Sequence, residues 1–193
     1  MARGPDRERP TVLVVEDEPD LLEIYGAWLA DSYDVKRAGN GMTAIELMDD
    51  SVDVALLDRK MPDMSGDQVL EHIREVGYDC QIAMVTAVDP GIDVAEMGFD
   101  DYVRKPVTRE DVTGVVERLL RRRSYKDRLQ EYLAVVSKLV ALDAADGDHS
   151  NADRYLALVE RKQQLRAEID RTTDSFDAAD LEATMAEFAD LDM

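Results

Sequence analysis

The apolar positions of residues 11–123 alternate between short β-branched runs and stretches with helical spacing. The first helical stretch carries Leu21, Ile24, Trp28 and Leu29 on one predicted face. Alternating strands and helices predict βαβ units, and strands that are apolar throughout predict a parallel sheet covered on both faces. The predicted strands are Thr11–Val15, Tyr33–Ala38, Val52–Leu57, Gln81–Thr86 and, more weakly, Tyr102–Val103.

Helix starts are marked by residues whose side chains cap free backbone N–H groups. The segment Asp93–Gly98 is shorter than the other helical stretches and predicts only a brief helix. The expected capping residues are Asp17, Asn40, Ser65, Asp89 and Thr108.

From about Ser124 the sequence predicts helices only. No Gly or Pro occurs between Val115 and Gly147, so the last helix of the first domain is expected to continue as one rod to Leu142. Apolar stripes on this rod and on the helix after it predict an antiparallel hairpin or a coiled coil. The stripes are Leu129, Leu133, Val136 and Val140, then Tyr155, Leu158, Leu165, Ile169 and Thr172, with a short final piece at Leu181, Met185, Phe188 and Leu191.

This change of pattern predicts three segments. Residues 1–10 form an N-terminal extension, residues 11–123 an α/β domain and residues 124–193 an all-α domain.

The charge balance is strongly acidic, with 43 acids against 23 bases and a formal charge of −20 over 193 residues. Such a surface suits either concentrated salt, where self-repulsion is screened, or a basic partner. The first interpretation is favoured by the even distribution of charge, with 27 acids and 15 bases in residues 1–123 and 16 and 8 in residues 124–193.

Other compositional features predict a cytoplasmic protein without membrane insertion. No apolar run approaches the roughly 20 residues that a membrane span requires. The charged N-terminus lacks the apolar stretch of a secretory signal, and the single Cys80 excludes an internal disulfide.

Polar residues follow four of the predicted strands, where the loops of a doubly wound sheet converge. A cluster of carboxylates without His or Cys suits Mg²⁺, and an aspartate within it can act as a nucleophile that forms an aspartyl phosphate. The ammonium and the hydroxyl would stabilise the phosphoryl oxygens. The converging set is Glu16, Asp17, Asp58, Thr86 and Lys105.

Four motifs occur in a specific order: VLVVEDEPD, LLDRKMPDMSG, MVTA and DDYVRKPV. With these motifs, residues 11–123 resemble the receiver domain of a two-component response regulator. The resemblance implies a flavodoxin-like, doubly wound parallel sheet of five strands in the order 2-1-3-4-5, with five helices. That order is a known property of chemotaxis receivers.

The resemblance also implies a magnesium-dependent phosphorylation site. Asp58 is the implied acceptor of a phosphoryl group from a sensor histidine kinase. Asp17 and Asp58 are implied to bind Mg²⁺ directly, Lys60 through its backbone carbonyl, and Glu16 through water. The receiver would catalyse its own phosphorylation and a slow hydrolysis, as a signalling protein and not as an enzyme.

The remaining motif positions are implied to sense the phosphoryl group. Thr86 would donate a hydrogen bond to it and Lys105 would form an ion pair with it. Tyr102 matches the switch aromatic, which turns inward when Thr86 moves. Pro106 is the expected site of a cis peptide.

Residues 124–193 resemble HalX, a helical domain attached to receivers in halophilic archaea, in position, length, helical character and acidity. Three outputs are considered. The hairpin could pair with itself or with a downstream protein, which would make the chain a homodimer or a module of a larger complex. It could bind DNA and regulate transcription, although the net charge of −8 in this segment argues against that. The chain could also be a phosphorelay shuttle with a passive tail.

Overall fold

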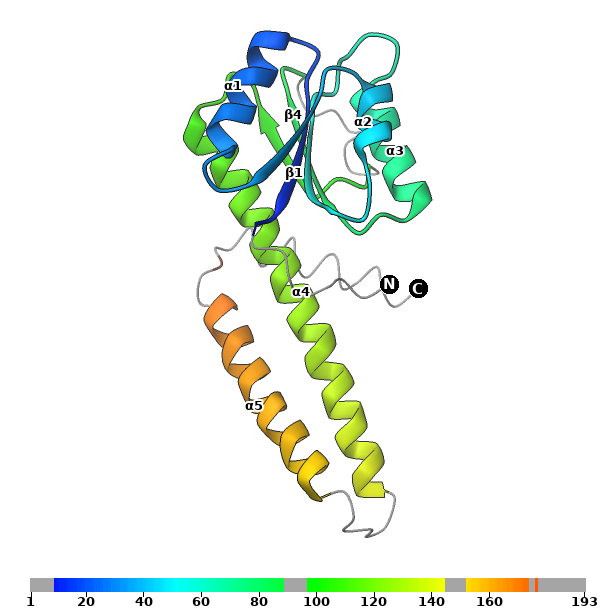
Figure 1. Cartoon of the computed structure of the whole chain (residues 1–193), viewed down its shortest axis with the longest axis vertical. Coiled ribbons are helices and arrows are strands. Elements are labelled where there is room, and N and C mark those ends of the chain that lie inside the picture. The colour runs from blue at the N-terminus through cyan, green and yellow to red at the C-terminus, as the bar shows by residue number, and fades with distance from the viewer. Residues whose placement is uncertain (1–8, 89–96, 145–151, 174–175, 177–193) are drawn as a thin grey trace. The chain divides into compact units, whose positions relative to one another are not determined.

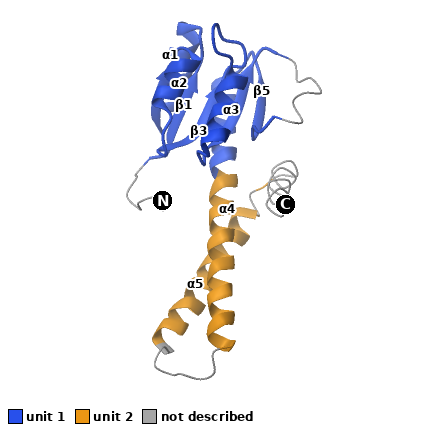
Figure 2. Cartoon of the chain, turned by 90° about the vertical axis from the view of Figure 1, so that its right-hand side faces the viewer, with its two compact units in different colours: residues 1–120 blue, residues 121–193 orange. Residues whose placement is uncertain are grey.

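A computed structural model describes residues 9–88, 97–144, 152–173 and 176. The chain divides into two compact units, residues 1–120 and residues 121–193 (Figure 2). The boundary falls within one helix, α4.

Unit 1 is built on a five-stranded parallel sheet in the order β2-β1-β3-β4-β5. The predicted fold class and strand order are therefore confirmed. The strands are β1 (Thr11–Val15), β2 (Asp34–Ala38), β3 (Val52–Leu57), β4 (Gln81–Thr86) and β5 (Asp101–Arg104).

Helices cover both faces of this sheet. Figure 1 shows α2 (Gly41–Leu47) and α3 (Gly66–Val76) on one side, and α1 (Pro19–Leu29) with the first turns of α4 (Arg109–Ala144) on the other. Alternate residues of each central strand point to opposite faces, so the sheet contributes to two cores. Leu13 and Leu57 lie in the core under α2 and α3, whereas Val12 and Leu56 lie in the core under α1 and α4.

The edge strand β2 differs from the expectation that every strand is apolar. Its sequence is DVKRA, and only Ala38 is fully buried. An edge strand exposes one side of its backbone, and charged side chains there discourage pairing with another sheet. The first helix also differs, because Ile24 is 42% exposed and Tyr25 takes the buried position.

Three predicted helix caps are confirmed. The Asn40 side chain accepts a hydrogen bond from the Thr43 N–H at 2.8 Å. Ser65 forms a reciprocal capping box with Gln68. Thr108 does the same with Asp111, since each backbone N–H donates to the other's side chain.

Asp17 is not a helix cap, which corrects the expectation from sequence. The N-cap of α1 is Glu18, which makes no side-chain capping bond, and Pro19 opens the helix because it has no N–H to satisfy. The expected cap Asp89 lies outside the described residues, as does most of the expected helix Asp93–Gly98.

Unit 2 contains an antiparallel helical hairpin, as the apolar stripes predicted. The expected rod is confirmed, since α4 continues without interruption to Ala144, and α5 spans Ala152–Thr173. Two ion pairs cross between the helices and fix their antiparallel direction. Arg161 pairs with Glu131 at 2.7 Å, and Arg128 pairs with Glu168 at 3.0 Å.

The buried stripe of α4 lies one position away from the expected one. Val135 and Leu139 are buried and pack with Leu165 of α5, whereas Leu133 and Val140 are 55% and 62% exposed. One residue on an α-helix is a rotation of about 100°, so the expected stripe largely faces away from α5. The α5 stripe is confirmed where the core forms, at Tyr155, Leu158 and Leu165.

Among the described residues, no helix is both long enough and apolar enough to cross a membrane.

Candidate functional site

Lys105 lies between two buried carboxylates at the carboxyl ends of the sheet strands. Its Nζ donates to Glu16 Oε2 and to Asp58 Oδ2, both at 2.6 Å. Glu16 is 1% exposed and Asp58 is 8% exposed. Three residues from distant parts of the sequence, after β1, β3 and β5, therefore form one charged cluster.

Asp17 adds a third carboxylate at the more open side of this cluster. One carboxylate oxygen from each of Glu16, Asp17 and Asp58 lies within 4.8 Å of the others. An all-oxygen donor set of this size fits a small, hard dication such as Mg²⁺, which keeps several waters and takes few carboxylate ligands. The residues present are therefore compatible with the magnesium that the sequence predicts.

The charges of the cluster are strongly coupled. Burial raises the pKa of the Glu16 carboxyl above its usual value, the charge of Asp58 raises it further, and Lys105 opposes both. Burial alone would lower the pKa of Lys105, but its hydrogen bonds to Asp58 and Glu16 outweigh burial and raise it. Lys105 thus remains an ammonium and compensates part of the negative charge.

Asp58 is held in place by its backbone on both sides. Its N–H donates to the Val15 carbonyl at 2.9 Å, which continues the β1–β3 pairing past the end of the strand. The Lys60 N–H donates to Asp58 Oδ1 at 3.2 Å. A Cβ on Gly66 would lie 2.2 Å from the Asp58 carbonyl oxygen, so only glycine permits α3 to begin this close.

Thr86 and Tyr102 meet at the backbone of Val88. The Val88 N–H donates to Thr86 Oγ1 at 3.3 Å, and the Tyr102 hydroxyl donates to the Val88 carbonyl at 2.6 Å. Thr86 is 1% exposed, and its carbonyl accepts a hydrogen bond from the Lys105 N–H at 2.8 Å. A short loop thus links the expected hydroxyl, aromatic and ammonium groups.

The peptide bond between Lys105 and Pro106 is cis, as expected. The sequence does not predict that the Val88 backbone bonds to Thr86 and Tyr102, because these bonds do not depend on the identity of the Val88 side chain. The sequence also does not predict the close approach of Gly66 to Asp58, although both residues belong to the motif LLDRKMPDMSG.

Two basic residues of the described part of unit 2, Arg128 and Arg161, form ion pairs with acids across the hairpin. A groove of about 410 Å³ between α4 and α5 is lined by Arg121, Ser124, Arg128, Glu168, Arg171 and Thr172.

A parallel sheet of this order occurs in flavodoxin-like folds, to which receiver domains belong. The family model of the response regulator receiver domain matches residues 12–117, and the model of the HalX domain matches residues 121–185. The chain therefore belongs to the response regulators and combines a receiver with a HalX domain. Receivers of this family typically use Mg²⁺ at such an acidic pocket.

Individual relatives agree with this assignment. A "Putative transcriptional regulator" of Haloferax volcanii is 44% identical over 159 residues, which are 81% of this chain and 27% of that protein. The response regulator MprA of Mycolicibacterium vanbaalenii is 30% identical over 80% of this chain and 69% of its own length. This chain thus spans about a quarter of the Haloferax relative.

Solved receiver structures match unit 1. The response regulator TrrA of Thermotoga maritima, in complex with Mg²⁺ and BeF, aligns with a TM-score of 0.52 at 30% identity and covers 57% of this chain and 99% of that one.

Proposed function

We propose that this chain is a response regulator that accepts a phosphoryl group on Asp58 from a sensor histidine kinase in a Mg²⁺-dependent reaction. Phosphorylation would then change the protein–protein pairing of its helical C-terminal domain. The observation that carries the proposal is the cluster in which Asp58 lies within 2.6 Å of the Lys105 ammonium and beside two further carboxylates.

The transfer needs one bond to form and one to break. An Asp58 carboxylate oxygen attacks the phosphorus of a phosphohistidine, and the P–N bond breaks as the O–P bond forms. The imidazole leaves and takes up a proton from solvent. Asp17, Asp58, Glu16 through water and the Lys60 carbonyl would hold Mg²⁺, which neutralises charge on the phosphoryl oxygens.

Lys105 has a different partner before and after transfer. In the unphosphorylated site its ammonium bridges Glu16 and Asp58. Once the Asp58 carboxylate carries a phosphoryl group, the same ammonium pairs with the new phosphoryl oxygens. The Lys105 ammonium thus exchanges its charge-assisted hydrogen bonds to the carboxylates for charge-assisted bonds to the phosphoryl oxygens.

Thr86 and Tyr102 transmit the change. The phosphoryl group is an acceptor for the Thr86 hydroxyl, which now accepts a bond from the Val88 N–H. Movement of Thr86 alters the loop whose Val88 carbonyl binds the Tyr102 hydroxyl. The aromatic side chain then changes position, and the surface around β5 is reshaped.

The C-terminal hairpin favours protein pairing over DNA binding as the output. Arg128 and Arg161, two bases that a DNA-binding face would need, already pair with acids of the same hairpin. A shuttle with a passive tail remains the alternative that deletion of residues 124–193 tests in the cell.

The direct test follows labelled phosphate from a purified, autophosphorylated kinase onto the full chain. Asp58→Asn should abolish labelling, and EDTA should abolish labelling of the unmodified chain. Asp50→Asn, an exposed aspartate outside the cluster, is the matched control and should label normally. Labelling of the Asp58→Asn chain at the same rate would overturn the proposal.

A further inference from the structure

The side of α4 that faces away from α5 carries a long face without charge. Its members recur at intervals of three and four residues, which places them on one side of the helix. All of them are exposed, in a chain of which 34% is charged. This outer face consists of Gln130, Leu133, Ala134, Ser137, Val140, Ala141 and Ala144.

The outer face is apolar and not merely uncharged. Leu133 is 55% exposed and Val140 is 62% exposed, so two large side chains stand in solvent one above the other. The Ser137 hydroxyl donates to the Leu133 carbonyl at 3.0 Å, which leaves little free polarity between them. The small side chain of Ala134 next to these residues allows another helix to approach closely.

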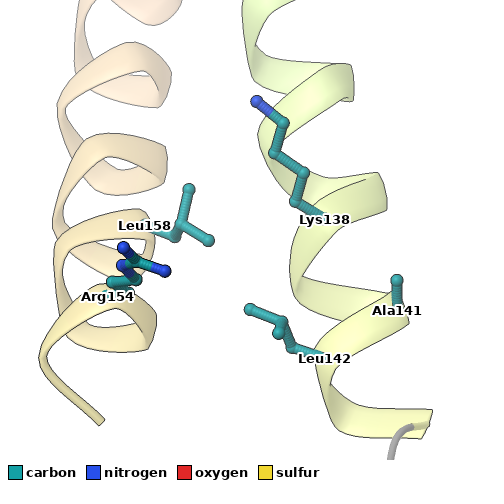
Figure 3. Close-up of a pocket in the computed structure, with 5 residues that line it drawn as sticks. All are labelled: Lys138, Ala141, Leu142, Arg154 and Leu158. Carbon is teal, nitrogen blue, oxygen red and sulfur yellow. The ribbon is translucent and has the colours of Figure 1, made fainter. Parts of the chain in front are cut away.

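The apolar surface continues into a groove between α4 and α5. Figure 3 shows this groove, in which Leu142 of α4 and Leu158 of α5 stand on opposite sides. Ala141 belongs both to this groove, of about 380 Å³, and to the outer face. Lys138 and Arg154 complete its lining.

We propose that the outer face of α4 binds the outer face of α4 in a second copy of this chain, with the two helices antiparallel. The inference rests on the proposed function and deepens it, because it names the partner and the surface of the pairing that phosphorylation would change.

The flanking charges select the antiparallel direction. Glu131 and Lys138 lie seven residues apart, hence on the same edge of the outer face. In an antiparallel pair related by a two-fold axis, this edge of one helix lies beside the same edge of the other, and the two sequences run in opposite directions along it. A two-fold axis near Ala134 then places each Glu131 opposite the partner copy's Lys138, twice by symmetry. Glu131 keeps its bond to Arg161, so the new contact would extend an existing ion pair.

The net charge explains why the contact must be uncharged. Two copies with a formal charge of −20 each repel one another over most of their surface. The outer face contributes no charge to that repulsion, and a strongly basic partner would find no acid on it. A second copy is the partner that meets this face with an equally apolar one.

Packing energetics points the same way. In the part of the hairpin that the structure describes, three apolar residues are buried, Val135, Leu139 and Leu165, with partly buried side chains packed against them. A helix pair with so small a core is marginal. Pairing of two hairpins would add the second packed side that α4 lacks.

The first experiment replaces one residue on the outer face and one outside it. Leu133→Glu places a charge in the proposed contact, and Leu156→Glu introduces the same change at a leucine of α5 with 58% exposure. Sedimentation equilibrium of the full chain in molar KCl should show a dimer. We expect Leu133→Glu to weaken dimerisation by about tenfold or more, because a buried unpaired charge opposes association. Leu156→Glu should leave it within about twofold.

The second experiment determines the direction by disulfide cross-linking. Ala134→Cys lies near the proposed axis and should form a disulfide between copies under mild oxidation. In Ala144→Cys the two thiols would stand about 28 Å apart along the helices and should not cross-link. Cys80 is buried, so the unmodified chain is the control and should give no cross-link. Cross-linking at both positions would show parallel helices and overturn the proposed direction.

The same measurements separate this inference from the proposed function. Beryllium fluoride with Mg²⁺ should shift dimerisation of the unmodified chain but not of Asp58→Asn. A dimer that is sensitive to Leu133→Glu but not to beryllium fluoride would support the surface and contradict the switch. A monomeric chain in both states, or equal effects of the two leucine variants, would overturn the surface.

Discussion

At the residue scale, the position of Asp58 in the candidate site is fixed by contacts with neighbouring residues. Asp58 is held from its backbone by Val15 and by Gly66, while Lys105 neutralises its side chain. The carboxylate that we propose to be reactive thus has a fixed position just after the end of β3. Positioning of this kind is the main contribution a protein can make to phosphoryl transfer.

Two glycine substitutions test this constraint with opposite expected signs. Gly66→Ala places a methyl group 2.2 Å from the Asp58 carbonyl oxygen and should destabilise the chain by about 1–3 kcal/mol. It should also slow phosphorylation, since Asp58 must move. Gly114→Ala, in α4, meets only the end of Arg118 at 3.7 Å and should stabilise by up to about 1 kcal/mol. Urea unfolding and acetyl phosphate labelling measure both effects, and equal stability of the two variants would contradict the contact.

Asp49 provides a pH-dependent prediction outside the site. Hydrogen bonds from Lys36 and Ser51 lower the pKa of its carboxyl from 3.8 to about 2. The folded state therefore binds this proton less readily than the unfolded chain. The ionised group stabilises the fold above pH 3.8, and that contribution is lost as the pH falls toward 2.

We expect Asp49→Asn to lower the free energy of unfolding at pH 7 by about 0.5–1 kcal/mol, a small value because the side chain is 59% exposed. The difference from the unmodified chain should shrink at pH 2.5. Asp50→Asn, at the next residue, is the control and should show neither effect. A difference that stays constant between the two pH values would contradict the assignment to Asp49.

At the scale of elements, the strands and three of the helix caps could be predicted because each depends on local sequence. The stripe on α4 could not, because Glu131 and Lys138 are the only charged residues between positions 129 and 142. With apolar residues on nearly every side, periodicity does not determine which side faces α5. The choice is made by tertiary contacts, above all by the burial of Leu165.

In the candidate site, too, some features follow from the sequence and others depend on tertiary structure. Its carboxylates and lysine could be expected together because parallel strands place their carboxyl ends at one edge. The function of Val88 could not, because two hydrogen bonds to its backbone depend on a loop geometry that side-chain patterns do not encode. Motif order therefore predicted which groups meet, but not the bonds that couple them.

Arg74 at the end of α3 joins three elements and gives the prediction at this scale. Its guanidinium donates to the carbonyls of Gly98 and Cys80 and to the Asp100 carboxylate, each at 2.8 Å. Asp100 also accepts the Ile82 N–H at 2.6 Å, at the start of β4.

Arg74→Leu should lower the free energy of unfolding by about 2–3 kcal/mol, because several partly buried acceptors lose a charged donor. Arg109→Leu is the control, since Arg109 forms a single ion pair with Asp31 that is 55% and 77% exposed. It should change stability by less than about 1 kcal/mol. Similar losses in the two variants, measured by urea unfolding, would contradict the bridging function of Arg74.

At the scale of the whole molecule, we expect repulsion among the acids to govern the response of stability to salt. Most ion pairs among the described residues are at least partly buried, whereas the acids of the whole sequence exceed its bases by 20. Folding brings these acids closer together than they lie in an extended chain, so their mutual repulsion opposes the compact state. Salt should therefore stabilise this chain, although it weakens each of its attractive pairs.

The expected dependence on KCl has a characteristic shape. The screening length falls from about 10 Å at 0.1 M to about 3 Å at 1 M, so most of the gain in thermal midpoint should occur within that interval. A general strengthening of apolar burial would instead continue to rise at higher concentrations. A variant with surface Asp replaced by Asn at several exposed positions should begin with a higher midpoint in dilute buffer and gain less from KCl. If the midpoint of the unmodified chain were constant or fell between 0.1 and 1 M KCl, attraction within its ion pairs would outweigh the repulsion among its acids.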